Sequence, residues 1–372
     1  MNTTPLPQRL GPWLRNHLPV VDPILLSVVG VLSLVGLVTL YSAASDHPGR
    51  FGEQLRNLAL AAVLMIAMAG LHPRMLKRMA LPVYAVGMLL LLAVLVGGVS
   101  VKGAQRWLDL GPLRIQPAEI MKLAVPLILA WFFDRREGSV GKLDFLVAAL
   151  LVLLPVALIA RQPDLGTAML VLAAGFFVIF FAGLPWIWLG VLVGGGLALI
   201  PVVWTLMHDY QRSRVLTLID PMSDPLGKGF HTLQAMIAIG SGGIFGKGWM
   251  QGTQTHLEFI PERTSDFIFA VYSEEFGLIG NLVLLALFVV LVGRAMAIAH
   301  QAATPFTRLL ASAIAMILFT FAFVNMAMVS GILPVVGVPL PFISYGGTAL
   351  VTLGMACGML MCVQSNRKFL QM

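Results

Sequence analysis

Acidic residues are concentrated in one short stretch of the sequence, HLEFIPERTSDFIFAVYSEEFG, at residues 256–277. Only 11% of the whole chain is charged, so a group of this kind calls for a chemical explanation. Asp266 lies directly before an aromatic and apolar run, and Arg263 precedes it by three residues. Apolar neighbours raise the pKa of a carboxylate and cationic neighbours lower it, so its proton affinity can be tuned to that of a general base. The alternative is that Ser265 or Asp266 simply caps the following helix.

Two further blocks place carboxylates at the beginning of apolar runs. In QPAEIMK, Glu119 and Lys122 are three residues apart, and both would share one face of a helix that begins at the proline. In RQPDLG, Asp164 has almost no loop in which to be solvated. These charged residues are candidates for a functional site. For Glu119 and Lys122 the alternative to a functional role is an ion pair that caps a helix. For Asp164 the alternatives to a functional role are a helix cap or a pair with Arg161 or Lys122.

The elements that must position these side chains are membrane helices. The chain has 372 residues, of which 58% are hydrophobic, well above the share of about 45–50% in soluble domains. Apolar runs of about 20 residues, enough to cross a bilayer, recur along the chain. The expected fold is an all-α integral membrane protein with ten transmembrane helices in a single domain, residues 1–372. The predicted spans are 23–42, 55–71, 79–98, 117–133, 143–160, 166–183, 185–206, 267–293, 308–329 and 346–363.

The distribution of lysine and arginine predicts the orientation, because positive residues are retained on the cytoplasmic side of short loops. It places both termini in the cytoplasm and the long connection between spans seven and eight, residues 207–266, outside it. Asp266, Asp164 and Glu119 then all lie at extracytoplasmic ends of spans, where ionisable groups are functional candidates. The segment LPVVGVPLPFISYGG, at 333–347, is rich in proline and glycine and predicts a broken or re-entrant turn that lines a cavity.

Several positive residues on the extracytoplasmic side go against the orientation rule. Solvation and attraction to lipid headgroups explain Arg50 and Arg56 as well as any function does. A functional role is favoured for others, which lie close to carboxylates. The candidates for binding an anionic substrate are Lys102, Arg106, Arg114, Lys122 and Arg263.

Other kinds of site are not indicated. The sequence has no GxxxxGK[ST] loop, no HExxH motif and no Cys/His cluster. Cys357 and Cys362 are five residues apart in the last span, as expected of packed thiols. A net charge of +7 is ordinary for a membrane protein with positive cytoplasmic loops, so no nucleic-acid partner is expected. No organic cofactor is expected either.

Four blocks in fixed order carry a resemblance to a known family: GAQRWLDLGPLRIQPAEIMKLAV, RQPDLGTAM, IPERTSDFIFAVYSEEFGLIGN and LPVVGVPLPFISYGGTAL. They resemble the SEDS family (shape, elongation, division and sporulation), and the resemblance covers essentially the whole chain. It implies a peptidoglycan glycosyltransferase of the bacterial cytoplasmic (inner) membrane, multi-pass, with its active site facing the periplasm. It also implies lipid II as substrate, a role in cell elongation and rod-shape maintenance, and a class B penicillin-binding protein as crosslinking partner.

The same resemblance assigns site residues. Asp266 falls at the position of the essential catalytic aspartate, and Glu119, Lys122 and Asp164 fall at the other motif positions. Many members of the family have His-Thr before the aspartate, where this chain has Thr-Ser, so no role of a neighbouring imidazole is carried over.

This substrate fits the candidate residues. Lipid II has a polyprenyl diphosphate leaving group, so the donor side requires cations rather than a strong acid. The acceptor hydroxyl must lose its proton, and Asp266 is the expected base in a displacement that inverts the anomeric carbon. A divalent cation, Mg²⁺ or Mn²⁺, is compatible with the diphosphate, with Asp266, Asp164 and Glu119 as candidate ligands.

Two rival functions remain open at this point. A flippase for the same lipid would also use many spans and broken helices, although transporters place their charges near the bilayer midplane. A non-catalytic scaffold for the penicillin-binding protein would not need Asp266.

Overall fold

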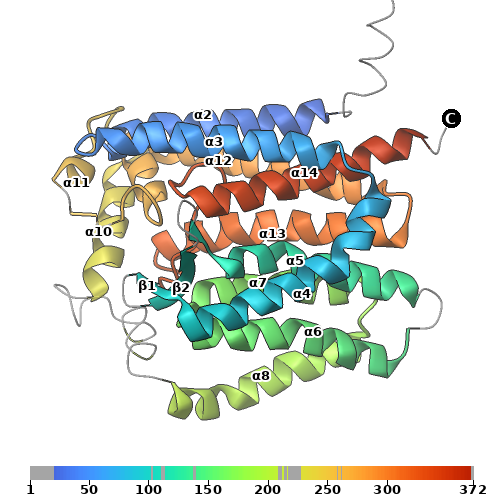
Figure 1. Cartoon of the computed structure of the whole chain (residues 1–372). Coiled ribbons are helices and arrows are strands. Elements are labelled where there is room, and N and C mark those ends of the chain that lie inside the picture. The colour runs from blue at the N-terminus through green and yellow to red at the C-terminus, as the bar shows by residue number, and fades with distance from the viewer. Residues whose placement is uncertain are drawn as a thin grey trace, which may run out of the picture.

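The computed structural model describes residues 21–101, 104–109, 114–136, 140–207, 212, 216, 228–257, 259–260 and 262–369. This part of the chain is mostly helical (Figure 1). The helices are α2 (Pro23–Ala43), α3 (Pro48–Ala69), α4 (Pro73–Gly97), α5 (Pro117–Arg135), α6 (Lys142–Arg161), α7 (Leu165–Phe181), α8 (Trp186–Leu206), α10 (Lys228–Ser241), α11 (Thr253–His256), α12 (Ile268–His300), α13 (Pro305–Val329) and α14 (Gly347–Phe369). Three short strands, β1 (Val99–Val101), β2 (Ala104–Asp109) and β3 (Arg114–Ile115), form antiparallel pairs in the order β1-β2-β3.

Each predicted span coincides with a helix. Among the described residues, seven helices contain segments that are long and apolar enough to cross a membrane: α2, α3, α4, α6, α12, α13 and α14. Helix α7 and most of α8 are shorter apolar helices, and α5 has 19 residues with charges at both ends. The predicted class, an all-α integral membrane protein, is therefore confirmed. The number ten, the orientation and the single-domain organisation remain predictions.

The largest difference at the start of a helix is at the second span. It was predicted at 55–71, but α3 begins at Pro48. A proline fixes φ near its helical value and lacks the N–H that the first turn leaves unused, so it favours a helix start. Arg50 consequently lies in the first turn of a helix rather than in a loop.

The small sheet was not predicted. It lies between α4 and α5, where Val99 faces Trp107 and Leu108 faces Ile115. Its strands have two to six residues, which is too short for a clear alternating pattern. The sheet holds the segment with Arg106 against the end of the bundle where α5 begins.

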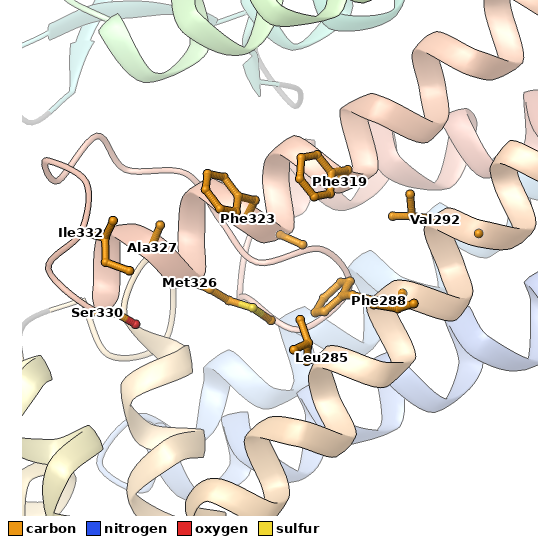
Figure 2. Close-up of a pocket in the computed structure, with 12 residues that line it drawn as sticks. Leu285, Phe288, Val292, Phe319, Phe323, Met326, Ala327, Ser330 and Ile332 are labelled. Carbon is orange, nitrogen blue, oxygen red and sulfur yellow. The ribbon is translucent and has the colours of Figure 1, made fainter.

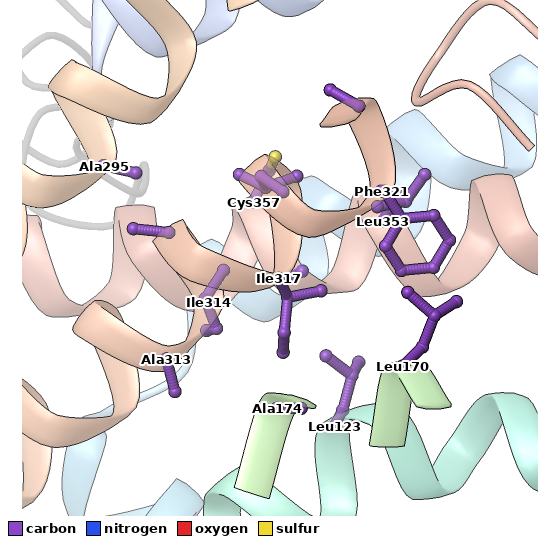
Figure 3. Close-up of a cluster of buried hydrophobic side chains, with 14 of the residues drawn as sticks. Leu123, Leu170, Ala174, Ala295, Ala313, Ile314, Ile317, Phe321, Leu353 and Cys357 are labelled. Atoms are coloured by element: carbon purple, nitrogen blue, oxygen red, sulfur yellow. The ribbon is translucent and has the colours of Figure 1, made fainter. Parts of the chain in front are cut away.

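The interior of the bundle is formed around α13, which packs against α12, α5, α7 and α14. Leu123 of α5, Ile317 of α13 and Leu353 of α14 lie in one buried cluster (Figure 3). Close approach of helices depends on small residues, because lipid tails are as apolar as the side chains and only good packing favours association. Gly175 of α7 shows this, since a Cβ there would lie 2.4 Å from Cγ2 of Val152 on α6.

An apolar groove of about 540 Å³ lies between α12 and α13 (Figure 2). Phe319 and Phe323, whose rings stack 5.6 Å apart, line it and are largely exposed. A patch of this kind is unfavourable in water but not among acyl chains, so it agrees with a membrane location.

Successive membrane helices run in opposite directions, so their ends alternate between the two ends of the bundle. In Figure 1 the sheet, α10 and α11 lie together at the left end, and the C-terminal end of α14 lies at the right. The first residues of α5, α7 and α12 all belong to the left end, which brings the predicted Glu119, Asp164 and Asp266 regions together.

The connection between α13 and α14 turns back into the bundle. Residues 331–346 are irregular, yet Val338, Leu340 and Ile343 are almost fully buried. A Cβ on Gly36, which lies about two turns from the end of α2, would be only 2.7 Å from the Cα of Ile343. The predicted re-entrant character of 333–347 is thus confirmed, and we call residues 331–346 the re-entrant loop.

The predicted long connection, 207–266, is described only in part, because most of 208–227 lies outside the described residues. Helix α10 matches the short helix that the sequence indicates at 229–240. Helix α11 follows after a glycine-rich segment.

Candidate active site

The backbone around Asp266 is held at three consecutive carbonyl groups. The oxygen of Thr264 accepts from Tyr345 N (2.9 Å), that of Ser265 from Ser344 Oγ (2.6 Å), and that of Asp266 from Asn325 Nδ2 (2.9 Å). All three donors come from α13 or the segment that follows it. A backbone fixed in this way holds the Asp266 side chain in a defined direction.

The Asp266 carboxylate is half-buried and faces the re-entrant loop. A Cβ built on Gly337, which has φ +73°, would lie 3.3 Å from Asp266 Oδ2, so the loop passes very close to the carboxylate. The alternative role as a helix cap is not observed. The N-cap of α12 is Phe267, with no side-chain capping bond, and the Ser265 hydroxyl donates to Glu262 instead.

The Asp164 carboxylate is buried and has several partners. It caps α7 by accepting from Thr167 N (3.2 Å), and it also accepts from Gln116 Nε2 (3.0 Å). Its cationic neighbour is Arg106 of β2, with Nη1 3.8 Å from Oδ1. The sequence left open a pair with Arg161 or Lys122, and neither ion pair forms among the described residues. Asp164 therefore caps α7 and also belongs to a cluster of polar side chains.

Glu119 and Lys122 form the ion pair that the sequence left open as an alternative, with Lys122 Nζ 2.5 Å from Glu119 Oε1. Both are buried, with 7% of Glu119 and 2% of Lys122 exposed. Lys122 Nζ also lies 4.7 Å from the centre of the Phe321 ring of α13, a cation–π contact. The pair thus contributes to the contact between α5 and α13.

The re-entrant loop connects the Asp164 and Asp266 blocks. A Cβ on Gly166 would lie 2.3 Å from the carbonyl oxygen of Val336, so the start of α7 touches the loop directly. The next residue, Gly337, is the one beside Asp266. Two blocks that are a hundred residues apart in the sequence therefore meet on one loop.

The predicted cations fall in different environments. Arg114 is exposed and pairs with Asp109 at 3.2 Å, whereas Arg106 is half-buried beside Asp164. Lys102 lies outside the described residues. Arg263 is buried: it donates to the carbonyl oxygens of Ala43 and Thr255 and pairs with Asp46.

Arg263 therefore anchors the end of α2 in this structure, and another arginine lies closer to the Asp266 motif. Arg50 donates from Nη1 to Thr264 Oγ1 (2.9 Å) and lies over the Tyr345 ring at 6.0 Å. The sequence left a function of Arg50 open without favouring it, because residue 50 was expected in the segment before the second span rather than on a helix. The proline at position 48 was the signal that could have placed it on a helix.

Glu274, another acid of the 256–277 stretch, has a structural role. Glu274 is fully buried and accepts from Lys247 Nζ (2.7 Å), Gln254 N (3.0 Å) and Thr255 N (3.3 Å). Helix α12 is interrupted at Gly277 (φ 64°), where Leu278 N and Ile279 N donate to the glycine-rich segment, at Gly243 O and Ile244 O. That segment is thus bound to α12.

The acid dependence of the Asp46–Arg263 pair can be predicted. Burial raises the pKa of Asp46, but the hydrogen bond and charge of Arg263, together with hydrogen bonds from the Asp46 backbone and His47, lower it further and hold the pKa at about 2, below the ordinary 3.8. A lowered pKa stabilises the fold above the unfolded value, and this contribution is lost as the pH falls through about 2. We expect Asp46→Asn to lower the melting temperature equally from about pH 5 to about pH 8, with the difference from the parent shrinking below about pH 4. Thermal unfolding in detergent over this range measures it, and a difference that changes near neutral pH would contradict the assignment.

The described residues do not form a pre-assembled metal site. Within the part of the chain that the structure describes, no three His, Cys, Asp or Glu side chains come together as ligands. Glu119 and Asp164 each have a cationic side chain beside them instead. The divalent cation that the sequence suggests remains a prediction.

Comparison with known proteins identifies the class. A family model described as "Cell cycle protein", covering FtsW, RodA and SpoVE, matches residues 18–369. The chain therefore belongs to the SEDS family of polytopic membrane proteins.

Individual relatives cover almost the whole chain. The chain is 48% identical to peptidoglycan glycosyltransferase MrdB of Escherichia coli over 96% of both proteins. It is 35% identical to the probable peptidoglycan glycosyltransferase FtsW of Trichlorobacter lovleyi, over 93% of this chain and 94% of that protein.

Solved structures agree. One, described as structural coordination of polymerization and crosslinking by a peptidoglycan synthase complex, matches with a TM-score of 0.82 at 35% identity, over 94% of this chain and 98% of that one. The rod shape determining protein RodA of Thermus thermophilus matches with a TM-score of 0.72 at 33% identity, over the same shares.

Proposed function

We propose that this chain is a peptidoglycan glycosyltransferase that extends glycan strands from lipid II at the periplasmic face of the cytoplasmic (inner) membrane. The observation that carries the proposal is Asp266, a half-buried carboxylate whose backbone is held from the following helices and which faces the re-entrant loop. A base in such a position is accessible to a sugar hydroxyl and also oriented. The names of the relatives, peptidoglycan glycosyltransferases, support the same activity.

The proposed reaction is a single displacement. The acceptor hydroxyl oxygen forms a bond to the anomeric carbon of the donor, and the bond from that carbon to the diphosphate oxygen breaks. The electron pair leaves with the polyprenyl diphosphate, and the hydroxyl proton passes to the Asp266 carboxylate. Because attack and departure occur on opposite faces, the anomeric configuration inverts.

Cations near Asp266 stabilise the departing diphosphate in this proposal. Arg106 and Arg114 are partly exposed at this end of the bundle, and Arg50 lies beside Thr264. Lys122 is almost completely buried and paired with Glu119, so in this proposal it influences the shape and charge of the site from the interior of the bundle.

Arg50 is expected to contribute to substrate binding. Arg50→Ala should raise the KM for lipid II about tenfold, as expected for one charge-assisted hydrogen bond to a phosphate oxygen. Arg56→Ala is the matched control, because Arg56 is an exposed residue of the same helix. Steady-state polymerisation kinetics of both variants measure the difference. Equal effects of the two substitutions would assign Arg50 to general surface charge.

A class B penicillin-binding protein is the proposed partner. The support is the structural match to a chain of a complex described as coordinating polymerization and crosslinking. A partner that crosslinks strands would take its substrate from the same membrane face, where the proposed site lies.

The activity is tested with purified protein and its penicillin-binding partner in detergent micelles, using labelled lipid II. A micelle has no two sides between which a lipid can be moved, so a flippase would give no product there. The proposal predicts glycan polymer that a muramidase degrades. Lack of polymer with an active partner present would favour transport of the same lipid.

A further inference from the structure

Asn325 is a polar residue at an apolar position. It lies on α13, one turn before the helix ends at Val329, and none of its surface is exposed. Burying an amide is unfavourable unless its groups are hydrogen-bonded. Its nitrogen makes two bonds, to the carbonyl oxygens of Asp266 (2.9 Å) and Val338 (2.7 Å).

These two bonds fix the orientation of the amide. Both acceptors are carbonyl oxygens, and a flipped amide would place its own oxygen against them. The amide oxygen is in a less favourable position: Asn325 Oδ1 is buried without a hydrogen-bond partner among the described residues. An apolar side chain of similar size would avoid that cost but would take the donor away from both carbonyl oxygens, so the benefit of the asparagine is the link that it makes between their two segments.

The two carbonyl groups belong to segments that face each other across the candidate base. Asp266 carries the carboxylate, and Val338 follows Gly337, the residue against which that carboxylate lies. Asn325 therefore sets the distance between the backbone that carries the base and the loop opposite it. Ser344 also links the re-entrant loop to the backbone beside the base, because its hydroxyl donates to Ser265 O (2.6 Å) and accepts from Leu340 N (2.8 Å).

We propose that Asn325 is a positioning residue for Asp266: it joins the backbone of the base to the re-entrant loop and so holds the carboxylate in the geometry for proton transfer. The proposal rests on the proposed function, because it assumes that Asp266 is the base. Asn325 touches no substrate atom and acts only through Asp266.

The test uses three substitutions of graded chemistry. Asn325→Ala removes both donors, Asn325→Ser keeps one O–H for one of the two carbonyls, and Asn325→Asp keeps the shape but turns an oxygen toward them. We expect kcat per folded molecule to fall by at least about tenfold in the alanine variant, less in the serine variant and most in the aspartate variant. KM for lipid II should stay within about twofold, because the substrate contacts are intact.

Controls separate positioning from stability. Ser312→Ala removes a buried polar group from the same helix at a distance from the site, and it should lower the melting temperature without lowering kcat. Ser344→Ala removes the neighbouring carbonyl contact and should lower kcat even if the Asn325 variants fold poorly. The acid limb of the kcat profile against pH should also move in Asn325→Ser, which a purely structural role would not cause.

Two results overturn the proposal. One is a parental kcat per folded molecule in the Asn325 and Ser344 variants, and the other is a loss confined to KM. The proposed function fails separately, if Asp266→Asn keeps the parental rate. An inactive Asp266→Asn beside a fully active Asn325→Ala would remove only the positioning role.

Discussion

Replacing Asp266 with asparagine is expected to lower the rate of lipid II polymerisation by about 10²–10⁴-fold, the usual contribution of a general base. The amide has nearly the same shape but cannot take up the proton of the attacking hydroxyl. The backbone bonds at Thr264, Ser265 and Asp266 do not involve the carboxylate, so the local fold should remain. Binding of lipid II should change much less than kcat, because the cations are untouched.

The measurement is the initial rate of polymer formation by purified protein with its penicillin-binding partner. Asp109→Asn is a suitable control, since Asp109 is an exposed carboxylate at the same end of the bundle and forms an ion pair with the exposed Arg114. Co-purification of the partner and an unchanged melting temperature would show that Asp266→Asn is folded. A variant of this quality that polymerises lipid II at the parental rate would refute Asp266 as the base.

Breaking the Glu119–Lys122 pair should have the second largest effect. Removing one partner of a buried ion pair typically costs about 3–5 kcal/mol, because the remaining charge is left without compensation. Here the partners are 7% and 2% exposed, so little water can replace the lost contact. We expect Glu119→Gln and Lys122→Met each to lower the melting temperature strongly and to lower activity with it.

Exchanging the two charges tests whether the pair acts only through mutual attraction. If so, Glu119→Lys with Lys122→Glu restores more activity than either single reversal. The restoration should be partial, because a glutamate at 122 cannot keep the cation–π contact with Phe321. Equal loss in the single and double variants, in folded protein, would instead indicate that each residue contacts substrate or metal on its own.

Sequence alone was sufficient for the membrane class and the approximate places of the helices. Apolar runs of this length cannot be soluble, and a bilayer leaves the backbone no option but helix in those segments. Sequence alone was also sufficient to predict the buried irregular segment at 333–347, because its prolines and glycines disfavour a regular helix and its apolar residues disfavour exposure to water. The Glu119–Lys122 pair followed from helical spacing, which brings residues three apart onto one face.

Which partner each charged residue takes was decided only by the tertiary structure. The sequence favours Arg263 over Arg50 as a substrate-binding residue, yet Arg263 is buried against Ala43 and Thr255, and Arg50 reaches Thr264. Asn325 gave no sequence signal at all, because a single asparagine in an apolar helix has no periodicity to interpret. Hydrophobic length is a local property that each segment carries by itself. Hydrogen bonds between residues 325 and 266, or 50 and 264, exist only once packing has brought distant segments together.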